Sequence, residues 1–93
     1  MILMVGAFVF VQSKLGRAYD VAKLIGNVDG VKWACAVTGV YDVIAYLEMP
    51  NMNSLSNLVI TKIQPIEGIE RTHTAVIVCS EGGSIEIPTD FDR

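Results

Sequence analysis

Residues 31–48 read VKWACAVTGVYDVIAYLE, two apolar runs on either side of a short polar break. The runs 31–37 and 43–48 are rich in β-branched and aromatic side chains, which favour extended strands. The break, TGVYD at 38–42, contains Gly39, whose missing side chain allows the backbone to reverse. The stretch therefore predicts a β-hairpin, and the other elements are placed around it.

Further strands and helices are predicted on both sides of this hairpin. An apolar run predicts a strand over 3–12, and a helical repeat of apolar residues predicts a helix over 17–25. After the hairpin, the break at 50–54 offers an Asn or a Ser as a cap for a helix over 54–63. A last strand is expected over 69–79. The helix residues expected to face the core are Ala18, Val21, Ala22, Ile25, Leu55, Leu58, Val59 and Ile63.

An internal repeat indicates how these elements combine. The pattern I-x-x-[VI]-[DE]-G-[VI] occurs at 25–31 and at 63–69, each time where a helix ends and a strand begins. Two βαβ units with right-handed crossovers interleave into one sheet. The predicted fold is α+β, a ferredoxin-like βαββαβ sandwich. Its four-stranded antiparallel sheet has the order 4-1-3-2, with two helices on one face.

The composition favours self-association. A chain of 93 residues has room for one domain, predicted over 1–79, and 52% of its residues are hydrophobic while 18% are charged. Because the helices cover only one sheet face, apolar residues from 7–11 and 43–47 remain uncovered on the other face. We therefore expect the sheet to pack on a second copy of itself.

Charge and length argue against nucleic acid and membrane as direct partners. The net charge is −3, and the seven Lys and Arg residues are scattered between positions 14 and 93, so no basic patch is expected for phosphates. The uncharged residues 1–11 have no basic region before them and are shorter than the ~20 residues of a membrane helix. They are interpreted as part of a buried strand.

The two cysteines, Cys35 and Cys79, lie in apolar strand runs. No CxxC motif or Cys/His cluster is present, so the sequence predicts neither a metal site nor redox chemistry, and reduced thiols are the expectation for a cytoplasmic protein. In the predicted topology the two lie on opposite edge strands, several spacings of ~4.8 Å apart. An intramolecular disulfide needs Cα atoms within ~7 Å and is not expected.

The tail, residues 80–93, differs in kind from the domain before it. After Gly82 and Gly83, the run 84–87 alternates polar and apolar residues until Pro88. Two interpretations stay open: an edge strand added to a neighbouring sheet, or a frayed terminus.

Catalysis has little support in the sequence. His73, the single histidine, has no recognisable Ser or Cys partner, the carboxylates are scattered, and no glycine-rich phosphate loop is present. We predict no catalytic residue, no metal and no cofactor.

Two polar stretches remain as candidates for ligand binding. The hairpin turn offers free N–H groups and the Asp42 carboxylate, and the alternation of Thr72 and Thr74 points both hydroxyls to one face of the last strand. In one interpretation Asp42 caps its own turn and the threonines bond across the sheet or to water. In the other, both stretches face a ligand pocket.

The patterns T-G-x-Y-D at 38–42 and I-x-x-I-x-G-I-x-x-T-x-T at 63–74 resemble the effector-binding (RAM) domain of the Lrp/AsnC transcription regulators. The likeness covers about residues 7–78. It implies a domain that dimerises through its sheets, whose dimers associate into rings, commonly octameric, with small effectors such as amino acids bound between dimers. The implied effector site consists of Gly39, Val40, Tyr41, Asp42, Thr72 and Thr74. Asp42 would pair with the ligand ammonium, and hairpin N–H groups and threonine hydroxyls would receive its carboxylate; His73 is given no role.

This sequence departs from the family pattern at its N-terminus. Regulators of this family carry a helix-turn-helix domain before the effector domain, whereas this sequence begins at the first strand. We therefore expect a stand-alone form that senses an amino acid by itself or modulates full-length relatives by co-assembly. The sequence does not indicate which amino acid is bound. The alternative is a small dimeric α+β barrel enzyme, monooxygenase- or isomerase-like, with Trp33 and His73 in a cleft between sheet and helices.

Overall fold

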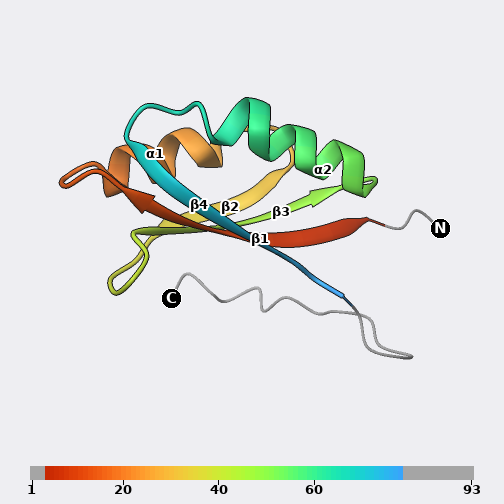
Figure 1. Ribbon diagram of the computed structural model, residues 1–93, viewed down its shortest axis with the longest axis horizontal. Helices are drawn as coiled ribbons and strands as arrows, with labels where there is room; N and C mark the ends of the chain where they lie inside the picture. Colours follow the sequence, from red (N-terminus) through yellow and green to blue (C-terminus); the bar gives the residue numbers. More distant parts are fainter. Residues whose placement is uncertain (1–3, 79–93) are drawn as a thin grey trace.

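The structure, a computed structural model, describes residues 4–78. Its elements are β1 (Val5–Ser13), α1 (Ala18–Gly26), β2 (Val31–Ala36), β3 (Val43–Met49), α2 (Met52–Leu58), the π-helical turn η1 (Val59–Ile63) and β4 (Ile69–Val76). The strands form one antiparallel sheet in the order β2-β3-β1-β4, and both helices lie on one face of it (Figure 1). The predicted fold and strand order are confirmed, since this is the order 4-1-3-2 counted from the other edge.

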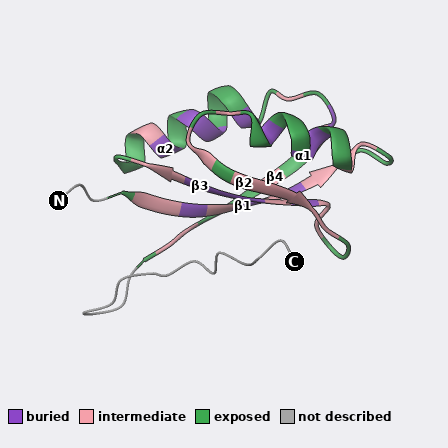
Figure 2. Cartoon of the chain, turned by 180° about the vertical axis from the view of Figure 1, so that it is seen from behind, coloured by how far each residue is buried: buried purple, intermediate pink, exposed green. Residues whose placement is uncertain are grey.

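The hydrophobic core lies between the helices and one face of the sheet (Figure 2). In β1 every second residue faces this core, and Ala7, Val9 and Val11 are completely buried. Seven of the eight predicted helix residues are buried, and Ala18 packs against them. Truncating a core side chain such as Leu47 to Ala typically costs about 2–5 kcal/mol.

The second helix differs from the regular helix predicted over 54–63. It begins at Met52 and continues into η1, where Gln64 N–H donates to the Val59 carbonyl at 2.9 Å, five residues back. In a regular α-helix, Ile63 would point about 80° away from Leu55. The wider π turn brings Ile63 back over the core, where it is fully buried.

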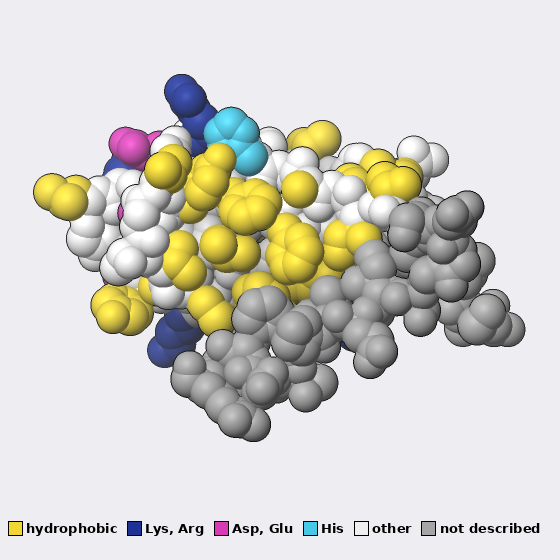
Figure 3. Space-filling model, turned by 90° about the horizontal axis from the view of Figure 1, so that it is seen from below, with side chains coloured by type: hydrophobic (Ala, Val, Ile, Leu, Met, Phe, Trp, Pro, Cys, Tyr) yellow, Lys and Arg dark blue, Asp and Glu magenta, His cyan; other side chains and the backbone are white. Residues whose placement is uncertain are grey.

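The opposite face of the sheet is apolar and is not covered by the helices (Figure 3). On this face the centroid of the Phe8 ring lies 5.2 Å from that of Tyr46 and 6.2 Å from that of Trp33. Beside these rings is a depression of about 450 Å³, lined by Phe10, Cys35 and Ile44 among others. This surface, called here the open face, is the apolar face that the sequence predicts on the side of the sheet away from the helices.

The cysteine and tail predictions are only partly within the described residues. Cys35 is a free thiol on the edge strand β2. Cys79 and the tail 80–93 lie outside the described residues, and β4 ends at Val76 rather than at position 79.

Asn51 caps the second helix, because its Oδ1 accepts the Ser54 N–H at 2.8 Å. We expect Asn51→Ala to lower the free energy of unfolding by about 1 kcal/mol, the usual value of such a cap. Asn53→Ala is the control, since Asn53 lies exposed in the first turn and Ala favours a helix. Urea denaturation of both variants at one protein concentration measures the difference; equal midpoints would contradict the capping role.

Candidate functional site

The predicted hairpin joins β2 to β3 through residues 37–42, with Gly39 at φ +124°. Val37 N–H donates to the Asp42 carbonyl at 2.8 Å, which closes the turn. Asp42 N–H donates to the Val11 carbonyl at 2.8 Å, and Asp42 Oδ2 accepts the Ser13 N–H at 2.8 Å. Asp42 is therefore half-buried and fastens the hairpin to the end of β1. Its other carboxylate oxygen, Oδ1, has no protein partner among residues 4–78.

The other three predicted hairpin residues differ in their exposure to solvent. Gly39 and Val40 are exposed, and the Val40 carbonyl accepts a hydrogen bond from Gln12 Nε2 at 3.2 Å. The Tyr41 ring lies 5.1 Å from Phe10, which places it over the end of the open face. His73, given no role from the sequence, touches the same ring edge-on at 5.8 Å.

Thr72 and Thr74 lie on the helix side of the sheet. Thr72 pairs with Val11 and Thr74 with Val9, and paired residues of antiparallel strands share a face. The expectation that both hydroxyls share one face is therefore confirmed. Thr72 Oγ1 accepts a hydrogen bond from Gln64 Nε2 at 3.3 Å. Thr74 is exposed and lines a groove between β4 and the second helix.

The six predicted residues form two groups in one protomer. The hairpin group is attached to the β3 side of β1, and the threonines are on its β4 side. Two strand spacings of ~4.8 Å separate the groups, and Tyr41 and the threonines lie on opposite faces of the sheet. One protomer therefore does not gather all six around one small ligand.

Sequence reasoning missed the partners of these residues. Each of three predicted residues accepts a hydrogen bond from such a partner: Asp42 from Ser13, Val40 from Gln12, and Thr72 from Gln64. These partners carry no local motif, since each lies between 8 and 29 positions away along the chain. Only the register of the sheet and the π turn bring them together.

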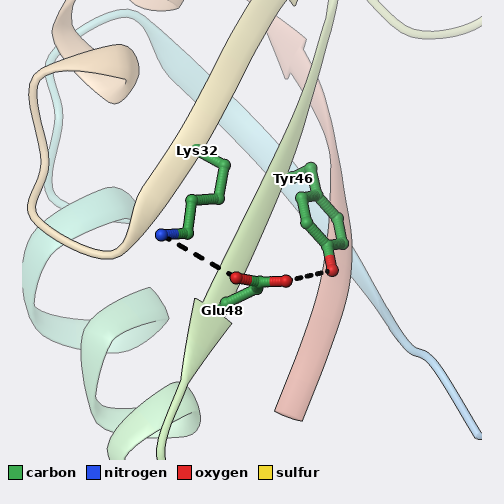
Figure 4. A network of polar contacts seen from close by, with 3 residues as sticks. All are labelled: Lys32, Tyr46 and Glu48. Atoms are coloured by element: carbon green, nitrogen blue, oxygen red, sulfur yellow. Dashed lines mark hydrogen bonds and ion pairs between the residues drawn. The ribbon is translucent and has the colours of Figure 1, made fainter. Parts of the chain in front are cut away.

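A polar network lies at the margin of the open face (Figure 4). The Tyr46 hydroxyl donates to Glu48 Oε2 at 2.9 Å, and Lys32 Nζ lies 3.8 Å from Glu48 Oε1. Tyr46 crosses β1 at Gly6, where an added Cβ would lie 2.7 Å from its hydroxyl. Burial raises the pKa of Tyr46 to about 12, with smaller contributions from the hydrogen bond and the charge of Glu48.

The two candidates for an enzyme cleft lie far apart on the sheet. Trp33 is in β2 and His73 in β4, the two edge strands, and both face away from the helices. They therefore do not line a cleft between sheet and helices. Among residues 4–78, no three His, Cys, Asp or Glu side chains are grouped to hold a metal ion. Within the same residues, no helix is long and apolar enough to span a membrane.

This chain is similar to a family of ligand-binding domains and to a transcriptional regulator. The family model of the Lrp/AsnC ligand binding domain matches residues 6–81. The HTH-type transcriptional regulator FL11 of Pyrococcus horikoshii is 28% identical over 82 residues, which cover 88% of this chain and 54% of that protein. The chain thus spans about half the length of this relative.

Two solved structures extend the comparison. TTHA0845 from Thermus thermophilus superposes with a TM-score of 0.77 at 28% identity, covering 82% of this chain and 95% of that chain. The transcriptional regulator NMB0573 from Neisseria meningitidis, in complex with L-Met, has a TM-score of 0.71 at 19% identity. The match covers 92% of this chain and 57% of that chain, and at this identity it shows the fold alone.

The raised pKa of Tyr46 predicts a high-pH titration step. Because the folded pKa is about 12 against an ordinary 10.0, the neutral phenol adds stability below about pH 10, and this contribution is lost as pH rises towards 12. Ultraviolet absorbance titration should show one tyrosine ionising near pH 12, and Tyr46→Phe should remove that step. In Glu48→Gln the pKa of Tyr46 should fall but stay above 10, because burial is the larger cause of its rise. A step that survives in Tyr46→Phe would refute the assignment.

Proposed function

This chain belongs to the Lrp/AsnC ligand-binding domain family, and on that premise we propose that it is a sensor of a free amino acid, not an enzyme. The protein acts as a sheet-to-sheet dimer or a ring of dimers in the cytoplasm. The effector binds where the hairpin of one copy meets the threonines of β4 from another copy.

The observation that carries this proposal is the state of Asp42. Its carboxylate is half-buried and held by Ser13 N–H, yet Oδ1 is without a protein partner among the described residues. An ammonium group that leaves water needs a charged partner, and this oxygen supplies one. Gly39 and Val40 lie in the exposed part of the turn, and in this proposal their N–H groups receive the ligand carboxylate.

The separation of the two residue groups supports binding between copies. The hairpin and the two threonines lie on opposite sides of β1, a separation that favours contacts to one small ligand from different protomers. The threonine hydroxyls then complete the contacts to the ligand carboxylate.

The relatives suggest the output of this sensor. FL11 is a helix-turn-helix regulator of about twice the aligned length, and NMB0573 was solved with L-Met. The domain influences transcription through full-length regulators of the same family with which it co-assembles. Domain 1–79 is the sensing unit, and 80–93 is an appended tail.

Replacement of Asp42 tests the site. A thermal-shift screen against the twenty amino acids first identifies the effector, since binding to the native state raises the melting temperature. Asp42→Asn keeps an acceptor for Ser13 N–H but removes the charge, which typically costs about 2–5 kcal/mol and weakens binding about 30-fold or more. Thr74→Val should cost on the order of 1–3 kcal/mol.

Asp29→Asn, at an exposed turn remote from the hairpin, is the matched control and should bind as wild type in calorimetric titration. Unchanged affinity in Asp42→Asn, with the assembly intact, would reject the assigned role.

A charge on the open face tests the assembly. Phe10→Glu places a carboxylate among the rings of Phe8 and Tyr41, so its burial against a second copy becomes unfavourable. Light scattering should show wild type as a dimer or larger and Phe10→Glu shifted to monomer. Leu15→Glu, fully exposed in the turn after β1, should assemble normally. A monomeric wild type at micromolar concentration would overturn the assembly proposal.

A further inference from the structure

The net charge of the chain comes from its tail, residues 80–93. Four of the ten acidic residues and one of the seven basic residues lie there: Glu81, Glu86, Asp90, Asp92 and Arg93. Residues 1–79 therefore hold six acidic and six basic residues and have no formal net charge. Because the tail is acidic and also contains Ile87 and Phe91, it fits a surface that offers both basic and apolar side chains.

One end of β4 offers basic side chains without acidic partners. Arg71 pairs with Gln12 and His73 with Phe10, so both side chains lie on the face of the sheet away from the helices. Among residues 4–78, neither forms an ion pair, and His73 contacts the ring of Tyr41 edge-on. This end of β4 can therefore accept carboxylates from another segment.

The outer edge of β4 presents its backbone groups in a defined pattern. Ile77 N–H donates to the Gly6 carbonyl at 2.8 Å, so the backbone groups of Ile77 point towards β1. Bonding alternates along an antiparallel ladder, so the odd-numbered residues of β4 bond to β1 and the even-numbered residues point outwards. Within residues 4–78, no strand pairs with this outer side.

We propose that the tail of the same chain pairs with the outer edge of β4 as a fifth, antiparallel strand, after a two-residue turn at Glu81 and Gly82. Ile87 then lies opposite Val76, and the two exchange backbone hydrogen bonds. Pro88, which has no N–H, turns that side of its backbone to solvent, where an edge strand tolerates proline. A register shifted by one residue would set Pro88 against an outward-pointing residue and lose a hydrogen bond.

The same register brings opposite charges together. Asp92 lies opposite Arg71, and Asp90 lies opposite His73, on the open-face side of the sheet. Cross-strand pairs of opposite charge stabilise a sheet, and an acidic tail beside two like-charged carboxylates would not. The charge of the tail and the unpaired Arg71 thus select this strand edge and this register.

The apolar residues of the tail fall on the other face. Ile87 and Phe91 lie on the helix side, and Ile87 is next to Val76, which lines a groove with Ile60 of the second helix. Ile60 is 59% exposed, so an apolar neighbour there removes surface from water. A fifth strand also covers a free edge to which strands of other molecules could add.

Amide hydrogen exchange in the full chain, followed by NMR, tests this docking. The N–H groups of Thr72, Thr74 and Val76 should exchange at least about tenfold more slowly than in an unstructured chain, because the tail bonds to them. Ile87→Pro removes one of these bonds and should return the three amides to fast exchange. The amide of Ala75, which bonds to β1, should stay protected in both proteins and is the internal control. Fast exchange of the edge amides in wild type would reject the inference, as would unchanged protection in Ile87→Pro.

A charge exchange tests the register. Asp92→Arg should lower the protection of the edge amides about fivefold or more, and adding Arg71→Asp should restore it. Glu86→Arg makes the same change of charge opposite the uncharged Ile77 and should leave protection as in wild type. An equal loss in Glu86→Arg, or no restoration in the double variant, would overturn the register.

Isotope-filtered NOE spectra of mixed labelled and unlabelled protein identify which copy supplies the tail. Contacts between the tail and β4 should arise within one copy, and contacts between copies would show that the tail adds to a neighbouring sheet instead. None of these measurements needs an effector, so their outcome is independent of the proposed function.

Discussion

The central strand β1 has to fit two different apolar layers at once. Ala7, Val9 and Val11 face the helices and are completely buried, whereas Phe8 and Phe10 face the opposite side and contact other aromatic rings. Because side chains alternate along a strand, a slip of one residue would exchange the two layers. Large rings would then face the helices at positions that hold only Ala and Val. The register of β1 therefore determines the core and the open face together.

That register also places the hairpin. Asp42 bonds to the backbone of β1 twice, through its N–H to Val11 and through Oδ2 to Ser13 N–H. A structural role and a ligand role for this carboxylate are compatible, because an ionised carboxylate has about four acceptor positions and one is used here. The bond to Ser13 holds Asp42 in a fixed orientation, which in the proposed site lowers the entropic cost of binding the effector.

Under the proposed function, the edge position of β4 connects effector binding with assembly. Within residues 4–78, β4 is an edge strand, and it carries Thr72 and Thr74 where the central strands carry buried apolar residues. In the proposed arrangement these hydroxyls and the hairpin belong to different copies, so a bound effector bridges protomers. By linkage, an effector that binds only between copies stabilises their association, and association raises the affinity for the effector. A change in effector concentration can thus become a change in assembly.

The sequence by itself determined the strands, the helices, their order and the apolar open face. Each of these follows from short-range patterns: alternation in the strands, the helical repeat around Val21 and Leu55, and the reversal at Gly39. The repeat at 25–31 and 63–69 extended this to the topology.

Only the tertiary structure decided which polar groups meet. Asp42 accepts a hydrogen bond from Ser13, 29 positions away in the sequence, and the π turn brings Gln64 to Thr72. Tyr41 and Thr72 lie on opposite faces of the sheet. These contacts depend on strand register and on the rotation of a helix around its axis. A shift of one residue in the strand register or in the helix alters these contacts without changing the local sequence pattern. No short stretch of sequence therefore encodes them.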